Sequence, residues 1–368
     1  METKKTPLFD GHNDTLTNLY EKNDLTGKGF IEGTQNLQLD LLKAIEVNLV
    51  GGFCAIFTPA EIPEEKSYSF GFEMTEGGFT TPIRSKVSQK FSEDYVNPII
   101  EYFYTIQNTS KGKVKVIRNY NELENAIAID AFSVVLALEG AEAIKEDLSN
   151  LYYYYDKGLR SLGLVWSRPN AFGMGAPFCF PKSPNIGDGL TSAGVNLVKR
   201  CNDLGIIVDL AHINEKGFWD VAKITNKPLV VTHTCAHKLC PSTRNITDEQ
   251  IDEVGKSNGI IGVNFEPVST SFNEELLKKM DIGQAIDYVN NLPISQITKH
   301  VEYIANRIGV DHVALGSDFD GAELPLEMKD ATGLTKLIES LKTAGFSNED
   351  IDKVACKNWL RVIKDTWK

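Results

Sequence analysis

The sequence contains no apolar run long enough to cross a membrane, since a transmembrane helix needs about 20 such residues in succession. Its first residues also lack the apolar segment that is typical of a secretory signal peptide. These two absences lead us to expect a cytoplasmic protein that does not act at a membrane.

Dense clusters of basic residues are also missing. Lysine and arginine together number 38 against 50 aspartate and glutamate residues, and the formal net charge is −12. A nucleic-acid-binding face needs concentrated positive charge, so no nucleic-acid partner is expected. None of the six cysteines forms a Cys-x-x-Cys pair. In a reducing compartment we expect them to be free thiols.

The chain of 368 residues does contain a long alternation of apolar and helical segments. Eight apolar segments predict buried strands: the first ends at residues 8–9, and the others are 47–57, 132–138, 159–166, 206–210, 229–232, 259–265 and 313–316. Amphipathic segments lie between most of them, and two or three helices follow the last strand, over residues 334–367. This order predicts an α/β fold, a (β/α)8 TIM barrel with extra C-terminal helices.

No change in composition marks a boundary inside the chain, so we expect residues 1–368 to form a single barrel domain. Two segments rich in glycine and proline, 59–85 and 167–189, are predicted to be long loops. Loops of that length in compact domains are usually functional.

The first predicted strand ends in the motif Asp10-Gly11-His12-Asn13-Asp14. On an extended backbone, His12 and Asp14 project from the same face because they are two residues apart. An imidazole and a carboxylate that converge in this way can bind a divalent metal such as zinc. The alternative is a capped turn in which His12 only forms a hydrogen bond.

Further residues of ligand or acid–base type follow other predicted strands. Active sites of TIM barrels lie at the carboxyl ends of the strands. The six residues at those ends are His12 and Asp14 on strand one, Glu139 on strand three, His212 on strand five, His233 on strand six and Asp318 on strand eight.

Each of these later residues is compatible with a purely structural role when taken alone. Glu139 precedes a glycine and could be part of a solvated turn. His212 is compatible with a buried histidine of the core, and His233 with a partner of His237. Asp318 is compatible with an Asx turn. Together these structural roles explain the group of residues poorly. An acidic cluster without lysine or arginine nearby costs folding free energy unless a cation neutralises it.

The number of ligands suits two metal ions. One site would use His12, Asp14 and Glu139. The other would use Glu139, His212 and His233, so that Glu139 bridges the two ions. Metals about 3.5–4 Å apart can share a hydroxide and polarise a carbonyl oxygen.

Asp318 is not needed as a ligand in this arrangement. It is therefore available as a general base and then a general acid. Three histidines and two carboxylates favour zinc over magnesium or calcium.

The ordered set of motifs resembles one family, the membrane (renal) dipeptidases and their bacterial relatives, which are zinc peptidases of the amidohydrolase-like barrel group. The resemblance extends from residue 8 to about residue 362. It is carried by Asp10-Gly11-His12-Asn13-Asp14, Leu138-Glu139-Gly140, Gly158-Leu159-Arg160, Gly189-Leu190-Thr191, Val208-Asp209-Leu210-Ala211-His212, Thr232-His233, Arg244-Asn245-Ile246, Val263-Asn264-Phe265, Gly316-Ser317-Asp318-Phe319-Asp320-Gly321 and Asn358-Trp359-Leu360-Arg361.

The resemblance implies that the five ligands named above bind two zinc ions and that Asp318 is the acid and base. It also implies that Arg244 binds the free C-terminal carboxylate of a dipeptide substrate. A guanidinium group suits that role because its fork matches a carboxylate bidentately. Family members often accept a D-residue at the second position, some open β-lactams, and a homodimer is usual.

The sequence departs from the family at two positions of the substrate site. Where better-known members have a histidine after the fourth strand, this chain has Trp166, so Arg168 or Asn170 is left to supply the oxyanion donor. Where some members have an aromatic residue after the seventh strand, this chain has Glu266. We therefore count Trp166, Asn170 and Glu266, with Arg244, as candidate substrate-binding residues.

Three functions remain open from the sequence. The first is a binuclear zinc dipeptidase. The second is another metal-dependent amidohydrolase on the same barrel, acting on a lactam or a cyclic amide. The third is a binding protein without activity, which the complete set of ligands and Asp318 argues against.

Overall fold

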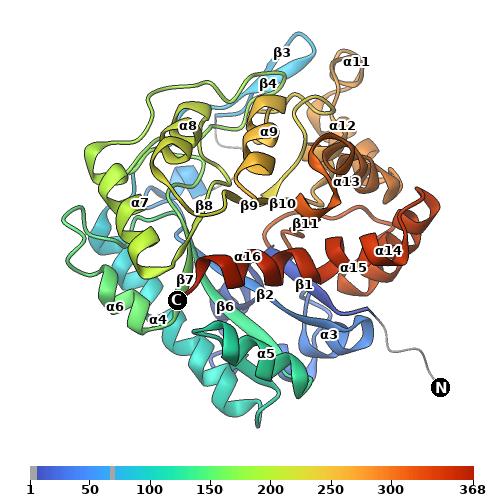
Figure 1. The fold of residues 1–368 in the computed structure, drawn as a ribbon. Helices are drawn as coiled ribbons and strands as arrows, with labels where there is room; N and C mark the ends of the chain where they lie inside the picture. The colour runs from blue at the N-terminus through green and yellow to red at the C-terminus, as the bar shows by residue number, and fades with distance from the viewer. Residues whose placement is uncertain (1–5, 67–70) are drawn as a thin grey trace.

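The computed structural model describes residues 6–66 and 71–368, and a parallel barrel lies at its centre (Figure 1). Its strands follow one another in the sheet in chain order. They are β1 (Leu8–Asn13), β2 (Leu49–Phe57), β6 (Phe132–Glu139), β7 (Leu159–Gly163), β8 (Ile207–Asp209), β9 (Val230–Thr234), β10 (Ile260–Val263) and β11 (Val313–Leu315). All neighbouring pairs are parallel, which confirms the predicted barrel.

The first and last strands meet where the barrel closes. The backbone N–H of Asp318 donates to the carbonyl of His12 at 3.0 Å, and that of Asp14 donates to the carbonyl of Phe319 at 2.9 Å. Asp10 accepts hydrogen bonds from both the backbone and the hydroxyl of Ser317, each at 2.8 Å. These bonds bring the motifs at the two ends of the chain to one rim of the barrel.

Helices surround the barrel (Figure 1). They are α1 (Thr15–Glu21), α2 (Lys28–Glu32), α3 (Leu41–Val47), α4 (Gln89–Thr109), α5 (Tyr120–Ala128), α6 (Leu151–Asp156), α7 (Ser192–Leu204), α8 (Glu215–Ile224), α9 (Asp248–Lys256), α10 (Pro267–Ser271), α11 (Glu274–Leu277), α12 (Ile282–Asn290), α13 (Ser295–Ile308), α14 (Leu334–Thr343), α15 (Asn348–Asp352) and α16 (Asn358–Thr366). Helix α9 begins with a capping box in which Thr247 and Gln250 satisfy each other's backbone N–H.

Several elements were not anticipated from the sequence. The segment 59–85 contains a short hairpin of β3 (Glu73–Thr75) and β4 (Gly78–Thr80), and β5 (Val114–Val116) adds to the edge of β6. Three-residue strands are too short to leave a periodic signal. The fourth barrel strand ends at Gly163, so Trp166 lies in the loop that follows rather than at the strand end.

Helix α16 crosses the end of the barrel that faces the viewer in Figure 1. Its Trp359 is fully buried and donates its indole N–H to the carbonyl of Leu315 at 2.9 Å. A Cβ on Gly11 would lie 2.5 Å from the Trp359 ring, so glycine permits this contact. The extra C-terminal helix therefore fills the end of the barrel.

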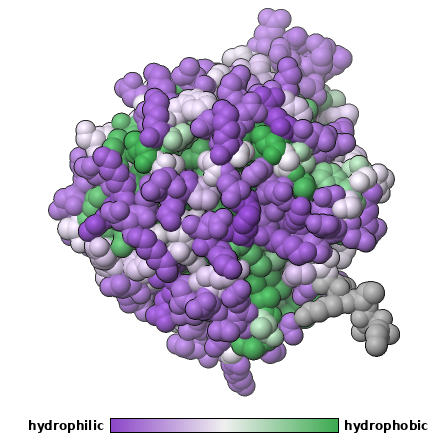
Figure 2. Space-filling view, viewed as in Figure 1, coloured by the Kyte–Doolittle hydropathy of each residue, from purple (hydrophilic) through white to green (hydrophobic). Residues whose placement is uncertain are grey.

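The surface view in Figure 2 shows mainly hydrophilic side chains with small separate apolar groups. Among the residues that the structure describes, no helix has the length and apolar character needed to span a bilayer. All six cysteines are buried free thiols, as expected.

Candidate metal centre

The six predicted site residues converge at the carboxyl ends of the barrel strands. His12 lies in β1, Glu139 is the last residue of β6 and His233 lies in β9. Asp14, His212 and Asp318 lie in the loops that directly follow β1, β8 and β11. Residues up to 306 positions apart in the sequence thus share one rim, because parallel strands end on the same side of a barrel.

The carboxylate of Glu139 is the centre of this group. Its Oε1 lies 2.7 Å from Nε2 of His212, 3.5 Å from Nε2 of His233 and 3.7 Å from Nε2 of His12. On the outer side, Nε2 of His12 is 3.4 Å from Oδ2 of Asp14. Glu139 therefore contacts both halves of the group.

The ligand atoms form two overlapping triads, each within 4.8 Å. One contains His12, Asp14 and Glu139, and the other contains Glu139, His212 and His233. Asp318 joins His12 and His233 in a third group of the same size. The first two triads are the sets that the sequence predicts for two metal ions.

The electrostatics of the group favour a cation. Burial lowers the pKa of His12, but the negative charges of Glu139, Asp14 and Asp318 outweigh it and raise that pKa to about 10. Burial also lowers the pKa of His212 and His233 to about 3, so both rings are neutral, the form that binds a metal. Burial raises the pKa of Asp14 to about 7.

Two buried atoms of the group have no hydrogen-bond partner. They are Nε2 of His12 and Oδ1 of Asp14. Buried polar atoms without partners are rare in folded proteins, and coordination of an ion is one way in which such atoms are satisfied. The donor set of imidazoles and carboxylates fits zinc, and an ion would take the place of the proton on His12.

Hydroxyl groups orient two of the histidine rings. Ser167 Oγ lies 2.8 Å from Nδ1 of His212, and Thr232 Oγ1 lies 3.0 Å from Nδ1 of His233. Thr232 also donates to Oδ2 of Asp209 at 2.6 Å. Because Nδ1 is occupied in both rings, Nε2 is directed to the metal centre. Sequence spacing assigns no role to these three partners, although two of them lie within the motifs named above.

Two site residues adopt a left-handed backbone. His212 and Asp318 both have φ of 63°. Non-glycine residues reach this region at a cost, and such strain clusters at functional sites. Near Asp318, a Cβ on Gly321 would lie 2.2 Å from Oδ2 of Asp14 and 2.5 Å from Oδ1 of Asp318. Glycine at this position lets the two carboxylates approach each other.

Asp318 is well placed to exchange a proton at the centre. Its Oδ1 lies 4.0 Å from Nε2 of His12, and its Oδ2 accepts a hydrogen bond from the amide of Asn264 at 2.9 Å. Its side chain remains 15% exposed, more than the side chain of any residue of the first two triads. Asn264 orients this carboxylate, a role that the sequence does not reveal.

Arg244 lies at the edge of the centre. Its Nη2 is 3.2 Å from Nε2 of His212, and the side chain is buried. Burial lowers the pKa of Arg244, and the nearby charge of Asp318 opposes that shift. His237, which could have paired with His233, instead lies 3.1 Å from the carbonyl of Lys182.

The remaining candidates differ in their access to the centre. The ring of Trp166 lies 5.8 Å from that of His212 and packs beside Phe57 and Phe178, so it forms a wall of the site. The side-chain N–H of Asn170 donates to the carbonyl of Leu164, and its Oδ1 accepts hydrogen bonds from the backbone N–H groups of residues 172 and 173. Asn170 thus shapes its own loop.

Arg168 has partners for two of its guanidinium nitrogens, Nε and Nη2, whereas Nη1 is buried without a hydrogen-bond partner. It forms a buried ion pair with Glu142 at 2.9 Å and donates to the carbonyl of Thr58 at 2.6 Å. Its guanidinium lies 5.3 Å from the ring centre of Trp166, a cation–π contact that helps to hold this ring in place.

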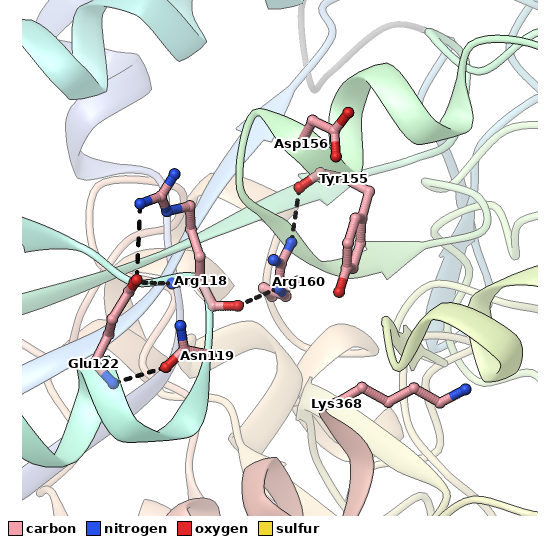
Figure 3. A pocket seen from close by; sticks show the side chains of 7 residues that line it. All are labelled: Arg118, Asn119, Glu122, Tyr155, Asp156, Arg160 and Lys368. Carbon is pink, nitrogen blue, oxygen red and sulfur yellow. Dashed lines mark hydrogen bonds and ion pairs between the residues drawn. The ribbon is translucent and has the colours of Figure 1, made fainter.

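A separate cavity of about 380 Å³ lies near the amino end of β7, away from the metal centre (Figure 3). Its buried Arg160 donates to the backbone carbonyls of Arg118, Tyr155 and Leu159. A cation is favoured at the C-terminus of a helix such as α6. Arg160 therefore ties α6 to the segment before α5, and none of the predicted site residues lines this cavity.

A family model described as membrane dipeptidase (peptidase family M19) matches residues 3–368. The chain belongs to this family. The resemblance seen in the sequence is thereby confirmed, and so is the assignment as a metal-dependent hydrolase of the dipeptidase type.

Related sequences from two organisms match most of the chain. An uncharacterised protein in the pqqA 5′ region of Klebsiella pneumoniae is 39% identical over 259 residues, which is 70% of this chain and 91% of that protein. Dipeptidase aclJ of Aspergillus oryzae is 26% identical over 366 residues, 98% of this chain and 78% of that protein.

Two crystal structures show the same architecture. The dipeptidase AC, a metallopeptidase of family M19, is 35% identical with a TM-score of 0.89 and 99% coverage of both chains. A metallopeptidase from Rhodobacter sphaeroides, bound to a phosphinate mimic of the dipeptide L-Ala-D-Ala, is 36% identical with a TM-score of 0.90. That match covers 99% of this chain and all of the other.

Proposed function

We propose that the protein is a binuclear zinc dipeptidase that hydrolyses free dipeptides and accepts a D-residue at the second position. The observation that carries this proposal is the shared carboxylate of Glu139, which contacts His12, His212 and His233 at once. The proposed acceptance of a D-residue is supported by the Rhodobacter sphaeroides relative, whose ligand mimics the dipeptide L-Ala-D-Ala.

The metal ligands would be divided between two ions. His12, Asp14 and Glu139 would hold one, and Glu139, His212 and His233 the other. A bound pair of zinc ions supplies an activated water and polarises the scissile carbonyl. The buried ligands of the chain keep the charge of this centre out of bulk water, which strengthens its electrostatic effects.

Asp318 would move the proton. Its carboxylate accepts a proton from the attacking water and returns it to the leaving amine. Asn264 keeps Oδ2 engaged, so Oδ1 is the oxygen left for proton transfer.

Arg244 would bind the substrate carboxylate. Its Nη2 now contacts Nε2 of His212, but that nitrogen cannot accept a hydrogen bond while it binds a metal. The guanidinium is then available for a carboxylate, which it can hold bidentately. Trp166 would form the apolar wall beside the substrate.

The test of this function is hydrolysis by metal-stripped and zinc-reconstituted protein. The substrates are an L-L dipeptide, an L-D dipeptide, a tripeptide and an N-acetylated dipeptide. We expect zinc to restore cleavage of the free dipeptides alone, with two ions bound per chain. Cleavage of only the blocked substrate would instead indicate another amidohydrolase, and no cleavage with two zinc ions bound would reject the proposal.

Replacing Arg244 by alanine tests the carboxylate contact. We expect Arg244→Ala to raise KM for a free dipeptide by about 10-fold or more, the size of a lost charge-assisted hydrogen bond. A C-terminally amidated dipeptide, which has no carboxylate to lose, should change little. Equal losses on both substrates would contradict the assignment.

A further inference from the structure

Glu266 is a carboxylate at the carboxyl end of the barrel that forms no ion pair with a lysine or arginine of the part of the chain that the structure describes. It lies three residues beyond the end of β10 and immediately before α10, and it is partly buried. Its Oε2 accepts a hydrogen bond from the hydroxyl of Ser269. Among the described residues, no lysine or arginine nitrogen lies within 4.0 Å of this carboxylate.

On one side, Glu266 is linked to the proton-transfer residue. Its backbone N–H donates to Oδ1 of Asn264 at 2.7 Å, and the amide of Asn264 donates to Oδ2 of Asp318 at 2.9 Å. A single side chain thus connects Glu266 to Asp318.

On the other side, Glu266 is linked to the segment that carries Arg244. The carbonyl of Ser269, whose hydroxyl contacts Glu266, accepts a hydrogen bond from the amide of Asn245 at 2.8 Å. Burial raises the pKa of Glu266, and the charges of Asp318 and Arg244 both act on it. Hydrogen bonds through Asn264 and Ser269 thus connect Glu266 to Asp318 and to the segment that carries Arg244.

We propose that Glu266 selects dipeptides whose C-terminal residue has a cationic side chain. The inference rests on the proposed dipeptidase function, in which Arg244 holds the substrate carboxylate. The charges of Glu266 and Arg244 act on each other, so Glu266 opposes a substrate carboxylate at that arginine and loses its countercharge when the neighbouring side chain is neutral or acidic. A substrate cation removes both penalties, since a partly buried charge is costly without a partner. Discrimination by an unpaired charge is a common route to specificity.

The experiment compares Ala-Lys with Ala-norleucine, which has an unbranched alkyl side chain without the ammonium. Each substrate is supplied with an L- and with a D-residue at the second position. We expect kcat/KM of the zinc-loaded protein to be about 10-fold or more higher for the lysine substrate. In Glu266→Gln the ratio should fall close to one, because the amide neither attracts the lysine ammonium nor opposes the binding of Ala-norleucine. Zinc content measured on the same sample checks that the metal centre is intact.

Glu323→Gln is the matched control. Glu323 is an exposed carboxylate at the same rim whose charge also acts on Glu266. Glu323→Gln removes the same unit of negative charge but leaves the proposed contact between Glu266 and the substrate ammonium intact. The preference for the lysine substrate should therefore persist.

Three results would overturn the inference. The first is equal cleavage of the two substrates by the native protein, and the second is a lysine preference that survives in Glu266→Gln. The third is a similar loss of activity on both substrates in Glu266→Gln, which would assign Glu266 to the α-ammonium that all dipeptides share. If the native protein cleaves Ala-norleucine, any of these three results rejects the role of Glu266 and leaves the proposed dipeptidase function standing. Absence of all dipeptide cleavage would reject the proposed function together with the inference.

Discussion

Asp318→Asn should lower kcat by a factor of about 10² to 10⁴, the usual contribution of a positioned general base. The variant keeps the size of the side chain and an oxygen that can accept the hydrogen bond of Asn264. An amide cannot take up a proton at the pH of the reaction, so only proton transfer is removed. Steady-state rates on a free dipeptide, with zinc content measured on the same sample, test this expectation.

The zinc content separates two roles for Asp318, because its carboxylate also lies within a possible ligand group with His12 and His233. Retention of both ions with low turnover supports proton transfer. Loss of an ion together with activity would instead make Asp318 a ligand, and near-normal turnover would contradict both roles. The control is Asp311→Asn, which makes the same change at an exposed aspartate just before β11, the strand that Asp318 follows. This variant should leave the rate unchanged.

Glu139→Gln should reduce both zinc binding and activity. Oε1 of Glu139 lies within 3.7 Å of three imidazole nitrogens, so the neutral amide weakens both proposed metal sites. We expect fewer than two zinc ions per chain and a fall in turnover of about 10³ or more, since a metal contributes several kcal/mol to the transition state. Metal analysis after dialysis and rates with added zinc provide the measurement.

The control for this variant is Glu146→Gln, which makes the same chemical change at an exposed position in the loop after β6. That variant should retain full zinc content and activity. If Glu139→Gln also kept two tightly bound ions, the bridging role of Glu139 would be wrong.

The barrel was predictable because its signals are local. Each buried strand, such as residues 132–139, is an apolar run of the kind that a parallel sheet covered on both faces requires. The start of helix α9 is likewise marked by a local signal, the capping box of Thr247 and Gln250. Elements without such signals were missed, among them β5, whose three residues take their conformation from pairing with β6.

The candidate ligands were predictable for the same reason. Glu139 and His233 directly follow apolar runs and His12 lies three residues beyond one, and the topology of a barrel brings these strand ends to one rim. The residues that orient them were not predictable. Ser167 and Asn264 are ordinary polar residues in sequence, and only their contacts with His212 and Asp318 distinguish them.

Asn170 and Trp166 illustrate the same limit. Both follow the fourth strand, where a substrate-binding residue is expected, and the sequence treats them alike. In the structure, Asn170 bonds to its own loop while Trp166 packs beside His212. The direction of a loop side chain depends on packing against distant segments, which local patterns do not encode.

The sequence by itself determined the barrel, the metal-binding residue types and their common rim, because periodicity and strand ends are properties of neighbouring residues. Only the tertiary structure decided that Glu139 contacts all three histidines and that Asn264 donates a hydrogen bond to Asp318. It also decided that hydrogen bonds through Asn264 and Ser269 connect Glu266 to Asp318 and to the segment of Arg244. These contacts join loops that are far apart in the chain. Their geometry is therefore set by how the closed barrel places those loops.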